Sequence, residues 1–130
     1  MNKVADRDED FLVCRGRLRV IRFANVDGVP SPAKEGLSEL PEKIQNAFKK
    51  RFLRLCEDGR LPKPRQIQQL DDVIWELKHD SGWRISAFQQ GKVWLLANVF
   101  RKPGKRRLKQ EIKRAREIRL AHLSKTEGKQ

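Results

Sequence analysis

The sequence predicts an α+β domain built on a small, mainly antiparallel, twisted sheet, and three observations support this. A helix-start signal at Ser31 and Pro32 and apolar residues at helical spacing from Pro41 to Glu57 predict helices, and three segments with strand-like character follow in residues 73–100. A strongly basic segment with helical spacing comes last. Because the helices and strands are segregated along the chain, we expect one domain with the helices packed on one face of the sheet.

The N-terminal residues are acidic, and we expect residues 1–13 to form a flexible arm. The folded domain is then expected over residues 14–125, with a disordered tail over residues 126–130. In residues 15–26, aliphatic residues alternate with arginines, as in a strand with one face in water. The turn at Asp27 and Gly28 ends this strand.

Two helices are predicted next. Ser31 and Pro32 suit the start of a short first helix, with Ser31 as its cap. A second helix is expected from Pro41 to Glu57, and Gly59 can take the left-handed conformation that ends it. One face of this second helix carries apolar residues at three- and four-residue spacing: Ile44, Ala47, Phe48, Phe52, Leu55 and Cys56.

A proline-rich linker over residues 60–72 leads to the three strands. Residues 73–78 and 83–88 alternate apolar and polar side chains and are joined by a turn at Gly82. Residues 92–100 are nearly all apolar, which predicts a central strand covered on both faces. The alternation places Trp75 with the core side chains.

Positive charge is the most unusual property of the composition. The formal net charge is +13, and residues 101–125 carry eleven Lys or Arg but only two Glu. Such an excess favours a polyanionic partner, because Lys and Arg release counterions from phosphates. The last helix lacks the large aromatic residues of a membrane-surface helix, and no apolar run reaches membrane-spanning length, so we expect a cytoplasmic protein with no membrane partner.

Cys14 and Cys56 lack the spacing and the nearby histidines of a zinc site, so no metal site is predicted. Cys56 is expected to be a buried thiol, and a disulfide between the two remains open. His122, far along the last helix, is expected on the surface.

Four segments together resemble the RelE/ParE toxin superfamily, and within it the HigB branch of phage-derived toxins from type II toxin–antitoxin pairs. They are RVIRFANVDGVPSPAKEGLSELPEKIQ (residues 19–45), VIWELKHDSGWRISAF (73–88), VWLLANVFRK (93–102) and RKPGKRRLKQEIKRA (101–115). Each motif alone is short, but their order and spacing match the family over roughly residues 17–120. The resemblance implies a RelE-like fold, with two N-terminal helices on the sheet and a basic C-terminal helix.

The resemblance also implies a function, namely that of a ribosome-dependent mRNA endonuclease, or mRNA interferase. Its partners would be mRNA in the ribosomal A site and a cognate antitoxin, a helix-turn-helix protein like HigA. Such enzymes use the substrate's 2′-OH as nucleophile and need no metal or small-molecule cofactor. Two other readings stay open: a ParE-like inhibitor of DNA gyrase, and a nucleic-acid-binding module without catalytic activity.

Cleavage through the 2′-OH needs a base, a cation at the phosphate and an acid for the leaving oxygen. Arg84 matches the family's phosphate-binding arginine, and its planar group can hold two phosphate oxygens. Lys78 and Lys102 match basic positions that close two strands. His79 has an imidazole suited to proton transfer near neutral pH.

Further basic residues are candidates for binding the RNA backbone, and Trp83 is a candidate for stacking on an unpaired base, with a core position as the alternative. The candidate phosphate-binding residues are Arg101, Lys105, Arg106, Arg107 and Lys109. The chain departs from many RelE-like nucleases in having no tyrosine. The groups that transfer protons are therefore the least defined part of this hypothesis.

Overall fold

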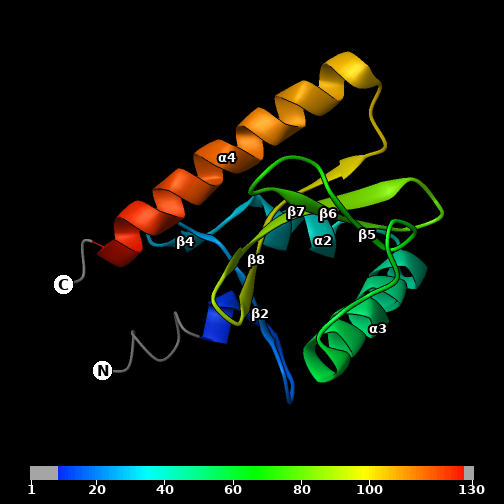
Figure 1. The fold of residues 1–130 in the computed structure, drawn as a ribbon, viewed down its shortest axis with the longest axis horizontal. Coiled ribbons are helices and arrows are strands. Elements are labelled where there is room, and N and C mark those ends of the chain that lie inside the picture. Colours follow the sequence, from blue (N-terminus) through cyan, green and yellow to red (C-terminus); the bar gives the residue numbers. More distant parts are fainter. Residues whose placement is uncertain (1–8, 128–130) are drawn as a thin grey trace.

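The computed structural model describes residues 9–127, with side chains to residue 125, and it contains a six-stranded sheet between helices (Figure 1). The strand order is β1-β2-β8-β7-β6-β5, in which β2 and β8 are parallel and all other neighbours are antiparallel. The strands are β1 (Leu12–Arg15), β2 (Val20–Phe23), β5 (Ile67–Gln69), β6 (Trp75–Lys78), β7 (Trp83–Gln90) and β8 (Val93–Arg101). A separate hairpin pairs β3 (Asn25–Val26) with β4 (Val29–Pro30). The α+β class and the mainly antiparallel sheet are confirmed.

Besides helical residues 9–11, this part of the chain contains α2 (Pro32–Ser38), α3 (Glu42–Asp58) and α4 (Lys105–Glu127). Their positions agree with the periodicity, and Gly59 ends α3 with a φ of 82°. Ser31 occupies the N-cap position of α2 as predicted, but its side chain does not cap the helix. Its hydroxyl makes no cap hydrogen bond and instead donates to the carbonyl of Leu96 at 2.7 Å, which satisfies a buried hydroxyl.

The helices cover both faces of the sheet, so the predicted packing on a single face is wrong. Trp94 and Leu96 of β8 belong to one apolar cluster with α2 and α3, whereas Leu95 and Ala97 belong to a second cluster with Ala115 of α4. Figure 1 shows α4 on one side of the sheet and α3 on the other. Successive side chains of a strand point to opposite faces, so a strand that is apolar throughout requires cover on both sides.

Both predicted ends of the domain need correction. Phe11 is buried and β1 pairs with β2, so residues 11–13 belong to the fold rather than to a flexible arm. Residues 126–127 continue α4, so the predicted tail begins later than residue 126. The remainder of the predicted arm at residues 1–8, and residues 128–130 of the predicted tail, lie outside the described residues.

The predicted linker contains β5, which pairs with β6 at the edge of the sheet. The loop between these strands is fixed by Asp71, whose Oδ1 accepts the amides of Val73 at 3.0 Å and Ile74 at 2.6 Å. The other oxygen of Asp71 accepts from Nε of Arg116 on α4 at 2.6 Å. The loop therefore connects the edge of the sheet to the helix that covers it.

His122 is buried, contrary to the prediction of a surface position. The amide of Asn25 in β3 donates to its Nδ1 at 2.8 Å, and its Nε2 lies 3.1 Å from Oε1 of Gln90. These contacts hold the C-terminal half of α4 against β3 and the end of β7. No helix in the described part of the chain is long and apolar enough to cross a membrane.

Candidate nucleic-acid interface

The turn between β6 and β7 and the end of β8 bring most of the predicted site residues to one end of the sheet. The amide of His79 donates to the carbonyl of Trp83 at 3.0 Å, and the amide of Gly82 donates to the carbonyl of His79 at 3.0 Å. The amide of Lys102 donates to the carbonyl of Gly82 at 2.6 Å. Gly82 has a φ of 101°, which a residue with a side chain rarely adopts. The backbone at these positions is therefore well fixed.

Arg84 is a buried arginine rather than an exposed one, with 8% of its surface accessible. Its Nη1 donates to the carbonyls of His79 at 3.0 Å and Trp83 at 3.2 Å, and its Nε lies 3.7 Å from Oε1 of Glu76. Nη2 makes no hydrogen bond within the described part of the chain. The guanidinium is thus held on one side by the protein, and two of its N–H groups remain for a ligand.

Glu76 is a functional candidate that the sequence analysis missed. It lies on the same face of β6 as Lys78, and its cross-strand partner is Ser86, two residues from Arg84. Burial raises the pKa of Glu76, although the charges of Arg84 and Lys78 oppose that shift. A carboxyl group that titrates above its usual range beside a cation is suited to proton transfer. The sequence signal was a charged residue among apolar ones in a predicted strand.

His79 points away from this face of the sheet. Its ring lies 5.9 Å from the ring of Phe48 on α3, and Ser81 donates its amide to Nδ1 at 3.0 Å. Burial, and next the charge of Arg51, lower the pKa of His79, while Asp80 opposes them. The lowered pKa favours the neutral imidazole, in which Nδ1 accepts the amide of Ser81. Although Arg84 binds the carbonyl of His79, their side chains lie on opposite faces.

Trp83 and Arg101 are cross-strand neighbours on the face covered by α3. The Cζ atom of Arg101 lies 4.8 Å from the centre of the Trp83 ring, in a cation–π arrangement. Trp83 is half-buried and also packs against the core. A base could stack on this ring face only by displacing Arg101, so the core role of Trp83 is the better supported one. Lys102 is exposed at the end of the strand.

The first turns of α4 carry the densest charge and no acidic residue in the first turn. The positive end of a helix dipole lies at its N-terminus, so cations there are disfavoured unless an anion binds. None of these side chains makes an ion pair with another described residue. The exposed residues are Lys105, Arg106, Arg107 and Lys109. A polyanion would relieve this unfavourable concentration of charge.

The structure thus divides the candidate site, with Glu76 added to the predicted residues, into three parts. Glu76, Lys78 and Arg84 share the face covered by α4, whereas His79, Trp83 and Arg101 turn towards α3. The basic start of α4 follows directly after Lys102. Among residues 9–125, no group of three or more His, Cys, Asp or Glu side chains is placed to hold a metal ion. Comparisons with protein-family models and with curated proteins return no match.

Proposed function

We propose that this chain is an endoribonuclease of the RelE/HigB kind, which binds mRNA in the ribosomal A site and cleaves it through the 2′-OH. The observation that carries the proposal is the position of Arg84. It is anchored by two carbonyls beside the buried Glu76, at the end of the sheet where the basic segment 101–109 begins. An anchored guanidinium with unused donors is suited to stabilising charge on a phosphate, since it needs little reorganisation.

The proposed reaction uses three side chains on one face. Glu76 takes the proton of the 2′-OH, and the 2′ oxygen attacks phosphorus. Arg84 donates to a non-bridging oxygen, and the ammonium of Lys78 protonates the 5′ oxygen as its bond to phosphorus breaks. The products are a 2′,3′-cyclic phosphate and a free 5′-OH. Lys102 adds positive charge, and His79 is not needed for a proton transfer in this scheme, because its ring faces α3.

The test is cleavage of a defined mRNA on programmed ribosomes, measured in a single turnover. Glu76→Gln removes the base and keeps the shape, so we expect the rate to fall by about 100-fold or more. Arg84→Lys keeps the charge but loses the planar group, and a similar loss is expected. Lys92→Gln, in the exposed turn at the other end of β7 and β8, is the matched control. A folded Glu76→Gln variant that cleaves at the wild-type rate would remove Glu76 from the mechanism.

One observation favours a second candidate, a nucleic-acid-binding module without catalysis. Arg84 and Glu76 are both nearly buried, and the chain has no tyrosine to assist the reaction. Such a module would bind RNA through the start of α4 and leave it intact. Wild-type protein that binds programmed ribosomes but leaves their mRNA uncut would favour this candidate.

The proposal also implies a second partner. A toxin of this kind is held inactive by a cognate antitoxin, and the family resemblance points to a helix-turn-helix protein similar to HigA. Both proteins would act in the cytoplasm. A neighbouring reading frame whose product abolishes growth arrest by this chain would support this part of the proposal.

A further inference from the structure

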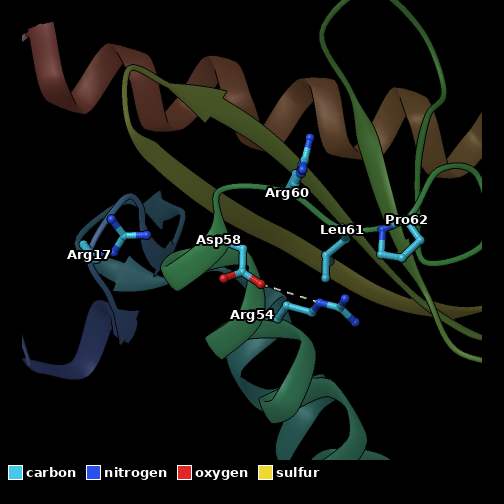
Figure 2. Close-up of a pocket in the computed structure, with 6 residues that line it drawn as sticks. All are labelled: Arg17, Arg54, Asp58, Arg60, Leu61 and Pro62. Carbon is cyan, nitrogen blue, oxygen red and sulfur yellow. Dashed lines mark ion pairs between the residues drawn. The ribbon is translucent and has the colours of Figure 1, made fainter.

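Two adjoining cavities follow the surface of α3, away from the face that carries Arg84. The first, of about 460 Å³, is lined by Arg17, Arg54, Asp58, Arg60, Leu61 and Pro62. Figure 2 shows that these residues come from three segments: the turn between β1 and β2, the end of α3, and the chain that follows it. The second cavity, of about 490 Å³, is lined by Lys43, Lys50, Arg51, Arg54 and Gln66, among others. Because Arg54 lines both, the two cavities adjoin along α3, and together they are here called the α3 groove.

The α3 groove is strongly cationic. Six Lys or Arg line it, and among the lining residues Asp58 is the single acid. Asp58 lies 3.7 Å from Nε of Arg54, but both side chains are more than half exposed, so water screens this pair. The side chains of Arg17 and Arg60 make no ion pair with any other described residue. The groove therefore keeps a net positive charge that favours an anion.

The first cavity is built on a fixed backbone. The amides of Leu18 and Arg19 both donate to the carbonyl of Cys56, at 2.8 and 3.0 Å. Gly16 permits this approach, since a Cβ at its position would lie 2.7 Å from the carbonyl carbon of Cys56. The turn that carries Arg17 is thus held against the end of α3, and the cations are positioned before a ligand arrives.

Arg51 is a second feature of the groove that favours an anionic ligand. Its Nη1 is buried and makes no hydrogen bond within the described part of the chain. A buried donor without an acceptor is unfavourable. Arg51 also lines the second cavity, where an anionic oxygen is the complementary ligand for the surrounding cations. Burial also lowers the pKa of Arg51, with Asp80 opposing this shift.

One end of the α3 groove lies near the turn between β6 and β7. The charges of Arg51 and Lys43 both act on His79, which places this end of the groove beside the turn between β6 and β7. From Lys43 to Arg54 the helix rises by about 17 Å, at 1.5 Å per residue. This length is sufficient for several successive phosphates of one strand.

We infer that the α3 groove binds the phosphate backbone of an RNA strand, on the side of the sheet opposite Arg84. The inference rests on the proposed RNA-directed function and adds a second binding surface to it. The cations of the groove form ion pairs with phosphates without reading bases. Binding in the groove is therefore independent of sequence and strongly dependent on salt.

The experiment measures binding of a fluorescent 12-nucleotide RNA with 2′-O-methyl groups, which cannot be cleaved through its 2′ oxygen. The groove variant carries Arg17→Gln, Arg54→Gln and Arg60→Gln, and the matched control carries Lys49→Gln, Lys92→Gln and Lys113→Gln. Both lose three positive charges, but the control residues lie outside the groove. Circular dichroism and the melting temperature establish that both are folded.

We expect the groove variant to bind at least 10-fold more weakly. Each phosphate contact contributes roughly 0.7 to the slope of log K against log salt, so the loss of three contacts should reduce the size of this slope by about 2. The control should change both quantities much less. Equal losses in the two variants would overturn the inference, since net charge alone would then explain binding. Tighter binding of a 12-base-pair DNA with the same dependence on the groove would also overturn it.

The same variants separate this inference from the proposed function. If wild-type protein leaves mRNA uncut on ribosomes but the groove variant loses RNA binding, the cleavage proposal fails and the groove stands. If the groove variant binds like wild type while Glu76→Gln abolishes cleavage, the groove assignment fails and the cleavage proposal stands.

Discussion

Nε of Arg84 lies 3.7 Å from Oε1 of Glu76, and the two side chains are only 9% and 8% exposed. They occupy neighbouring strands on the face of the sheet covered by α4. The pair is not a close one, and Arg84 has its shortest contacts with the carbonyls of His79 and Trp83. Arg84 thus contributes to the fold as well as being the main candidate for binding phosphate.

Removing the cation of this pair should lower stability. Arg84→Gln leaves the buried Glu76 without its neighbouring charge and frees two carbonyls, so we expect a loss of about 3 kcal/mol in the free energy of unfolding. In a Glu76→Gln background the same change should cost less, with a coupling energy of about 1 kcal/mol or more. Urea denaturation of the four proteins measures this. Additive single effects would show that the two side chains do not interact.

The titration of Glu76 should be visible in the dependence of stability on pH. Burial raises its pKa in the folded state, so the folded protein binds this proton more tightly than the unfolded chain. The stabilisation from this proton is fully present below the pKa of Glu76 in the unfolded chain. It is lost as the pH rises through the pKa of Glu76 in the folded protein. Glu76→Gln resembles the protonated form, so it should match wild type in acid and become relatively more stable above that range. Parallel stability curves for the two proteins would contradict this.

Asp71 and Asp72 provide a matched pair of variants. Each accepts a 2.6 Å hydrogen bond from Arg116, but only Asp71 also accepts the amides of Val73 and Ile74. We expect Asp71→Ala to lower the free energy of unfolding by about 2 kcal/mol, since charged hydrogen bonds to the backbone are lost. Asp72→Ala should cost less than about 0.5 kcal/mol, since its side chain is 81% exposed. Equal effects would show that the hydrogen bonds from Arg116, rather than those from the loop amides, account for the stabilisation.

The Asp71 effect should also disappear in acid. Burial opposes ionisation of Asp71, but the hydrogen bonds from Arg116, Ile74 and Val73 outweigh it and lower its pKa. A depressed pKa stabilises the fold above the ordinary aspartate range, and that contribution is lost as the pH falls through the folded pKa. The stability difference between wild type and Asp71→Ala should therefore shrink at low pH.

The two cysteines should differ in reactivity. Both are free, and Cys56 is fully buried, while Cys14 is partly exposed. Burial raises the pKa of Cys56 to about 12, so its thiol stays protonated at neutral pH. With iodoacetamide under native conditions, mass spectrometry should find modification at Cys14 first, and at Cys56 only after unfolding. Fast modification of Cys56 in the folded protein would contradict its burial.

The sequence by itself determined the elements and the charge. Start and stop residues located α2, whereas apolar spacing located α3 and α4 and alternation located β6 and β7, because burial of one face imposes a period on each element. The apolar run of β8 also indicated a central strand. The prediction of a polyanionic partner rests on composition, which folding does not change. The family resemblance and the function drawn from it come from the sequence and remain predictions.

Tertiary structure alone decided which charges are buried and which face each one occupies. Strands β1 and β5 were missed, since short edge strands carry little periodic signal and depend on pairing with residues elsewhere in the chain. Because α4 covers the face of the sheet opposite α3, Arg84 and Glu76 form a buried pair. His79 lies on the other face, against α3. Cations far apart in the chain, such as Arg17 and Arg60, meet in the α3 groove only after packing. Local sequence patterns report the neighbours of a residue along the chain, whereas exposure and charge pairing depend on neighbours that only the packed fold brings together.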